Sequence, residues 1–122
     1  MRPNQAYSIY LAHISEAIER AQRFLGDMPS EQFTLDEPIS HATVRQLQII
    51  GEAAKRLPSE IRALDPHIPW SDMARTRDRI IHGYDKVDLA VVWHTAQHDL
   101  PPLLPRLQQV LEQREDEEWE RE

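Results

Sequence analysis

Apolar residues recur every three or four positions along most of this chain, and this spacing limits the folds that it can adopt. The clearest run extends from Tyr7 to Leu25, where Gly26 and Pro29 follow. Residues at this spacing line one face of an α-helix, whereas a half-buried strand needs strict alternation. No stretch of the sequence shows a strand pattern. The chain is therefore predicted to be all-α.

A second helix is predicted to begin at Ser40, a suitable N-cap residue, and to end near Leu57. Gly51 interrupts it at a cost of about 1 kcal/mol relative to alanine, which suggests that another helix approaches closely there. The next residue, Glu52, is either an ordinary surface residue or a polar group near a site or interface. In the preceding connector, a single turn is expected to place Phe33 in the core.

Two further helices complete the expected fold. Residues 58–64 form a short turn, and a third helix begins at Trp70 or Ser71 and ends near His82, because Gly83 follows. Asp88 is expected to cap a fourth helix, which three prolines must kink or break: Pro101, Pro102 and Pro105. The sequence predicts an up-and-down bundle of four main helices plus a short one, over residues 1–115. Residues 116–122 are predicted to form a disordered acidic end.

Size and composition exclude several classes of protein. With 122 residues the chain suits one domain, and it contains no apolar run near the roughly 18 residues that a membrane span needs. It has no cysteine, which excludes disulfides and thiolate metal sites. We expect a cytoplasmic protein with no membrane association, no metal and no cofactor.

The net charge of −7 is unevenly distributed. Residues 112–122 carry seven acids and two arginines, which leaves the rest of the chain near −2. Residues 73–86 are locally basic. A small RNA or nucleotide site is compatible with this distribution, whereas a long phosphate-tracking surface is not. The acidic end is either a solvated terminus or a segment that competes with RNA or docks on a basic partner.

The stretch Arg77-x4-His82-x-Tyr84 contains three residues that can bind a phosphate or transfer a proton. An arginine guanidinium suits the charge of a phosphate and of its pentacoordinate transition state, and a histidine exchanges protons near neutral pH. Together they suffice for metal-independent RNA cleavage, in which the ribose 2′-hydroxyl attacks the adjacent phosphorus. Arg75 and Arg79 are expected to be solvated or to contact RNA weakly.

Helix geometry separates the arginine from the histidine. Positions five apart on an ideal helix are about 140° apart in projection, so Arg77 and His82 do not share a face. They converge if the helix loosens at Gly83, with His82 on its final turn, or if a second copy supplies its own motif. The spacing thus points to a composite site in a symmetric dimer.

Several short motifs, in order along nearly the whole chain, resemble those of one known family. They are Tyr10-Leu11, Ile50-Gly51-Glu52-Ala53, Ile68-Pro69-Trp70, the segment from Arg77 to Tyr84, Val87-Asp88, Trp93 and Leu100-Pro101. The chain resembles the HepT-like proteins, minimal members of the HEPN superfamily and ribonuclease toxins of prokaryotic toxin–antitoxin modules.

This resemblance implies an all-α homodimer with two Arg-x4–6-His motifs lining one cleft. The motif maps to Arg77, Asp78 and His82, where the family often has asparagine in place of Asp78. The implied activity is metal-independent endoribonuclease action on tRNA or mRNA. The implied partner is a minimal nucleotidyltransferase (MNT) antitoxin that transfers AMP to Tyr84, where added charge and bulk would block the cleft.

Two other classes of function remain open from the residues alone. The first is a non-catalytic dimer that binds nucleotide, RNA or the nucleotidyltransferase without cutting. The second is a metal protein, because His94-x3-His98 has ligand spacing on a helix. No third ligand is evident nearby, which favours surface or interface histidines.

Overall fold

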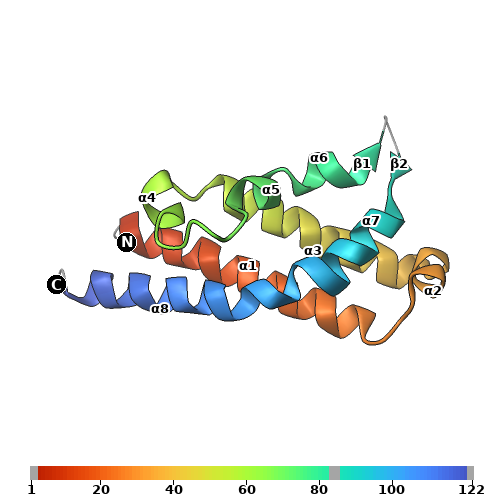
Figure 1. Ribbon diagram of the computed structural model, residues 1–122, viewed down its shortest axis with the longest axis horizontal. Coiled ribbons are helices and arrows are strands. Elements are labelled where there is room, and N and C mark those ends of the chain that lie inside the picture. The colour runs from red at the N-terminus through yellow and green to blue at the C-terminus, as the bar shows by residue number, and fades with distance from the viewer. Residues whose placement is uncertain (1–2, 83–85, 121–122) are drawn as a thin grey trace.

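The helix that begins the chain, α1 (Pro3–Leu25), packs along two other long helices, α3 (Glu37–Lys55) and α8 (Leu104–Glu120) (Figure 1). The computed structural model describes the backbone of residues 3–82 and 86–120, and the side chains of residues 7–81 and 86–113. The predicted apolar face of α1 is confirmed, because Leu11, Ile14 and Ile18 are fully buried. Gly26 ends this helix with a φ of 50°, a left-handed conformation that suits glycine.

The connector after α1 contains a short helix, α2 (Ser30–Leu35), which buries Phe33 as predicted. The predicted cap of the next helix was wrong. α3 begins at Glu37, and the Asp36 side chain caps it by accepting a 3.1 Å hydrogen bond from the Ile39 amide. Pro38 suits the first helical turn because its missing N–H would have had no partner there. Ser40 is buried inside the helix, and its hydroxyl donates to the Glu37 carbonyl.

The close approach predicted at Gly51 is confirmed. Helix α5 (Trp70–Ala74) crosses α3 at this position, and a Cβ on Gly51 would lie 3.4 Å from the Met73 carbonyl oxygen. The Ala74 carbonyl oxygen would be 3.7 Å away. There is room for one methyl group at this crossing but not for a branched side chain.

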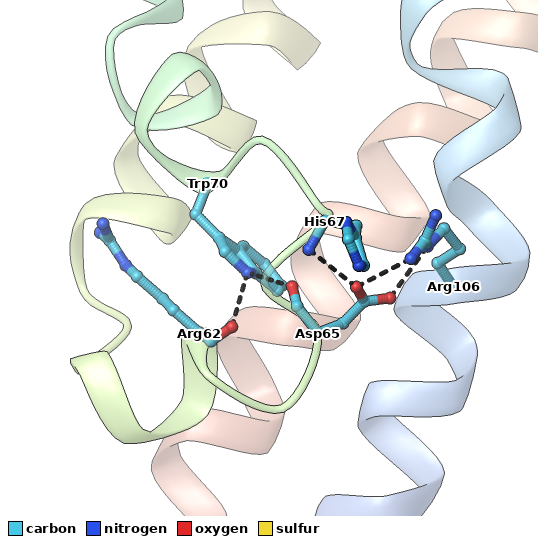
Figure 2. A network of polar contacts seen from close by, with 5 residues as sticks. All are labelled: Arg62, Asp65, His67, Trp70 and Arg106. Carbon is cyan, nitrogen blue, oxygen red and sulfur yellow. Dashed lines mark hydrogen bonds and ion pairs between the residues drawn. The ribbon is translucent and has the colours of Figure 1, made fainter.

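A corner joins α3 to α5 through the short helix α4 (Ser59–Arg62), and Figure 2 shows the polar contacts that hold it. The Trp70 indole N–H donates to the carbonyl oxygens of Arg62 and Asp65, at 3.0 and 2.9 Å. The Arg62 guanidinium donates to the Ala54 and Leu57 carbonyls, at 2.8 and 3.1 Å. The Ala54 carbonyl lies in the last turn of α3 and also accepts from the Leu57 amide, and Leu57 itself lies two residues beyond the helix.

An ion pair joins this corner to α8. Arg106 donates to both carboxylate oxygens of Asp65, each at 2.9 Å, and Asp65 also accepts from the His67 amide (Figure 2). The hydrogen bond from Arg106 lowers the pKa of the Asp65 carboxyl below its ordinary value, although partial burial opposes the shift. The same pairing raises the pKa of Arg106.

The third helix is not continuous, contrary to the prediction. α5 ends at Ala74, Arg75 interrupts the helix, and α6 (Thr76–Ile80) follows. The chain then forms a two-stranded antiparallel ribbon, although no strand was predicted. Strand β1 (Ile81–His82) pairs with β2 (Lys86–Val87) in the register Ile81 to Val87 and His82 to Lys86. Strands of two residues are too short to show alternation in sequence.

The fourth helix begins as predicted, because the Asp88 side chain accepts a hydrogen bond from the Val91 amide and caps α7 (Leu89–His94). A π-helical turn, η1 (Thr95–Asp99), and a 3-10 turn, η2 (Pro101–Leu103), then lead into α8. The break at the prolines is therefore confirmed. The backbone remains helical through Glu120, where the sequence predicted disorder, because glutamate, glutamine and arginine are good helix formers and no proline follows Pro105.

The predicted all-α bundle is confirmed, with α1, α3, the α5–α6 segment and the α7–α8 segment as its four main parts. The start of α1 and the end of α8 lie at one end of the bundle, and the β-ribbon lies toward the other (Figure 1). Within the described residues, no helix is both long enough and apolar enough to cross a membrane.

Candidate functional site: a polar pocket between α3 and α6

Arg77 lies on α6 and lines an open pocket of about 350 Å³ against α3. The other lining residues are Gln48, Gly51, Glu52, Lys55 and Ala74. The small residues Gly51 and Ala74 bring the two backbones together at the crossing. Arg77 stands one turn beyond Ala74, so its side chain reaches α3 beside the crossing.

The guanidinium of Arg77 is exposed and has no ion pair or hydrogen bond to any residue that the structure describes. Its neighbour Arg75 instead pairs with Asp72 at 3.6 Å. An unpaired arginine offers all five N–H donors in a planar fork that suits phosphate oxygens. In this pocket Arg77 is therefore available to bind an anionic ligand.

Glu52 forms a wall of the same pocket, so the structure places it beside Arg77. Glu52 is itself exposed, so its polar role near a site stays a prediction. Lys55 lies three residues after Glu52 and Gln48 lies four residues before it, so all three share one face of α3. Sequence reasoning missed these two residues, although their helical spacing from Glu52 was visible.

Arg79 does not join Arg77. It lines a different pocket of about 190 Å³, together with Asp72, Thr76 and Asp99. Residues two apart on a helix point in nearly opposite directions, so the two arginines face opposite sides of α6. Asp78 is exposed and lines neither pocket.

His82 lies in β1 and not on the last turn of a helix, so that part of the prediction was wrong. α6 ends at Ile80, whose carbonyl accepts a 2.6 Å hydrogen bond from the Asp88 amide as the ribbon closes. The backbone of His82 pairs with Lys86. The side chain of His82 and the whole of Tyr84 lie outside the described residues, so their positions relative to Arg77 stay predictions.

The histidine pair on α7 and η1 makes packing contacts. The rings of His94 and His98 have centroids 5.0 Å apart, and His98 meets the Trp93 ring edge-on at 5.2 Å. His94 Nε2 lies 3.5 Å from an Asp99 carboxylate oxygen. Among the residues that the structure describes, no three potential ligands gather to hold a metal ion.

These features define a small helical-bundle protein with an open, arginine-containing pocket beside the crossing of α3 and α5. A family model described as "Ribonuclease HepT-like" matches residues 14–110, and the chain belongs to this family. The match spans the pocket, the β-ribbon and the corner with its ion pair to α8.

Curated relatives agree with this assignment. "Probable ribonuclease HepT" of Thermococcus cleftensis is 42% identical over 99 residues, which cover 81% of this chain and 90% of that protein. "Putative RNase MJ0125" of Methanocaldococcus jannaschii is 33% identical over 114 residues, or 93% of this chain and 98% of that protein. "Putative RNase TTE0752" of Caldanaerobacter subterraneus is 35% identical, covering 84% and 92%. No solved structure matches this chain.

Proposed function

We propose that this protein is a metal-independent endoribonuclease, the toxin of a HEPN/MNT toxin–antitoxin module, and that it cleaves tRNA or mRNA in the cytoplasm. The observation that carries the proposal is the guanidinium of Arg77, which lines an open pocket five positions before His82 and has no partner among the described residues. The chain's membership of a ribonuclease family supports RNA as the substrate.

In the proposed reaction, the ribose 2′-hydroxyl attacks the adjacent phosphorus and the bond to the 5′-oxygen breaks. His82 takes or gives the proton, because imidazole exchanges protons near neutral pH. Arg77 binds the nonbridging oxygens and stabilises the charge that accumulates on them. The products are a 2′,3′-cyclic phosphate and a 5′-hydroxyl, so neither metal nor cofactor is required.

Glu52 and Asp78 are supporting residues in this proposal. Glu52 shares the pocket with Arg77 and can accept a hydrogen bond from its guanidinium or from the RNA. Asp78 follows Arg77 directly, and its carboxylate can orient the neighbouring cation or imidazole. Arg75 and Arg79 are too peripheral to the pocket to act in the chemistry, and they contribute at most weak attraction to RNA.

The proposed active form is a homodimer. Arg77 lies on α6 and faces α3, whereas His82 lies beyond the end of that helix in an extended strand. A two-fold axis near the ribbon would bring the motifs of two copies along one cleft, with an acid and a base available from separate histidines.

We further propose that a nucleotidyltransferase antitoxin silences the site by transferring AMP to Tyr84. The phenolic oxygen would attack the α-phosphorus of a nucleoside triphosphate and release pyrophosphate. The attached phosphate would add negative charge two residues beyond His82, where it would repel RNA and compete for the arginine.

Cleavage of total tRNA in EDTA tests the nuclease. The protein is purified away from any antitoxin and checked by intact mass for AMP, then compared with Arg77→Ala, His82→Ala and the matched control Arg79→Ala. We expect cleavage by the wild type and the control alone, with cyclic-phosphate ends. If the wild type cuts no more than the first two variants, the protein is a binding module.

The antitoxin step has its own test. Incubation with the nucleotidyltransferase and ATP should add the mass of AMP and abolish cleavage. Tyr84→Phe should escape both effects while retaining nuclease activity. Modification at another residue, or inhibition of Tyr84→Phe, would show that silencing works differently.

A further inference from the structure

A second pocket, of about 360 Å³, lies between α1 and α3 and shares Glu52 with the Arg77 pocket. Its other lining residues are His13, Glu16, Arg20 and Ile49. The three α1 residues are spaced by three and four positions, so they share one face of that helix. Glu52 therefore lines two cavities: one contains Arg77, which has no partner within the described part of the chain, and the other contains Arg20, which pairs with Glu16.

The charges of this second pocket disfavour a phosphate. Two carboxylates, those of Glu16 and Glu52, face the cavity against one arginine and one histidine. Arg20 is already turned toward Glu16, with Nη2 3.8 Å from a carboxylate oxygen. A phosphate entering here would meet like charge, whereas a neutral group rich in N–H donors would meet acceptors.

The same pocket has the parts of a nucleobase site. Ile49 is half-buried and packs against the core, so it offers an apolar surface. His13 is exposed and presents an imidazole ring of the kind on which unpaired RNA bases stack. Carboxylate oxygens at the rim accept hydrogen bonds from base edges.

We propose that this pocket binds the base of a nucleotide next to the scissile phosphate and selects guanine. This inference rests on the proposed ribonuclease function. Guanine presents two adjacent donors, N1–H and the N2 amino group, which one carboxylate can accept together. Adenine, cytosine and uracil each place an acceptor beside their donor on that edge. Glu16, whose carboxylate lies 3.8 Å from Arg20, provides the paired acceptors, and Glu52 separates the base from the phosphate held by Arg77.

The test compares cleavage of short single-stranded RNAs that carry guanine, inosine or adenine at either nucleotide flanking the cleaved bond. Inosine lacks only the N2 amino group. We expect kcat/KM to be about tenfold higher for guanine than for inosine, the size of effect that a good bidentate base contact provides. Glu16→Gln should reduce that ratio to near one, because an amide offers a single acceptor oxygen.

Glu19→Gln is the matched control, because Glu19 is an exposed residue of the same helix that does not line this pocket. It should retain the guanine preference. A wild type without preference, or a Glu16→Gln variant that keeps it, would overturn the subsite. Dependence of cleavage on Arg77 would still stand in either case, so the two proposals fail separately.

Binding provides a second readout that does not require cleavage. Fluorescence anisotropy of the same oligonucleotides on Arg77→Ala should preserve the guanine preference, and Glu16→Gln should remove it. The competing occupant of this face is a second copy of the chain. If Glu16→Gln weakens self-association in sedimentation without changing base preference, the face is an interface between copies and the base subsite is wrong.

Discussion

Two arginines close in sequence have opposite surroundings in this fold. At the corner between α3 and α5, Arg62 donates to two carbonyls at the end of α3. In the pocket between α3 and α6, Arg77 has no partner among the described residues and stays exposed. The first arginine joins the corner to the end of α3 through these two hydrogen bonds, so it stabilises the protein. The side chain of the second forms no hydrogen bond or ion pair within residues 7–81 and 86–113, so its donors are available for a ligand.

The surroundings of the two arginines differ in the same way. The corner is tied together by the Trp70 indole and by an ion pair between Asp65 and Arg106, residues 41 positions apart. Beyond it, the backbone changes from α5 to α6 to β1 within a few residues. The hydrogen-bonded corner beside the pocket can therefore hold the Arg77 guanidinium in position without neutralising its charge.

The sharpest way to test this contrast is to truncate each arginine. Arg77→Ala should reduce RNA cleavage by a factor of about 10² to 10³, the usual cost of losing one charge-stabilising group, with its melting temperature unchanged. Arg62→Ala should leave the kcat of the folded protein intact and lower its stability instead. Single-turnover cleavage and thermal melts on both variants measure the two effects. A large stability loss in Arg77→Ala would break the distinction.

The corner should respond strongly to loss of its central donor. Trp70 is buried, and Trp70→Phe would leave the Arg62 and Asp65 carbonyls without the indole N–H. Both carbonyls keep a backbone donor, the Asp65 and Ile68 amides, so we expect the free energy of unfolding to fall by about 0.5–1.5 kcal/mol, the net contribution of an ordinary hydrogen bond. Urea denaturation followed by circular dichroism measures it. Cleavage by the folded variant at low temperature should match the wild type, and a loss there would mean that the corner shapes the Arg77 pocket.

Gly51 connects the two regions, because it lies at the crossing and also lines the Arg77 pocket. Gly51→Ala should be tolerated, since the new Cβ would make ordinary contact at 3.4 Å and helix propensity would improve stability by up to about 1 kcal/mol. Gly51→Val should be destabilising, because its extra methyl groups would press on the α5 carbonyls. Thermal melts of both variants test the order, and equal stability would mean that the crossing adjusts freely.

Most of the helices could be predicted from the sequence because the features that specify a helix lie close together along the chain. The apolar spacing of α1, the cap at Asp88 and the small residue at the α3 crossing could all be read from neighbouring positions. The cap of α3 was misplaced because Asp36 and Ser40 are both good N-cap residues, and the deciding feature was Pro38 in the first turn.

The site was only partly predictable because it depends on tertiary contacts. Arg77 was identified from its motif, but Lys55 and Gln48 join it only because α6 lies against α3. The two-residue strands are joined to the end of α6 by the hydrogen bond from the Asp88 amide to the Ile80 carbonyl, a contact that no periodicity encodes. The pairing of Asp65 with Arg106 had no sequence signal for the same reason.

That ion pair yields the smallest expected effect, on the pH dependence of stability. Because Arg106 lowers the folded pKa of Asp65, the pair stabilises the protein above the ordinary carboxyl pKa near 4 and loses that contribution as pH falls through the lower folded value. Between pH 5 and pH 3, the wild type should therefore lose stability more steeply than Asp65→Asn. The difference should be smaller than the effect of Trp70→Phe, because the Arg106 side chain is 43% exposed and water screens the pair. Melting temperatures of both proteins across that range measure the difference. Parallel curves would mean that solvent screens the ion pair, and that the hydrogen bonds of the Trp70 indole and the Arg62 guanidinium hold the corner without it.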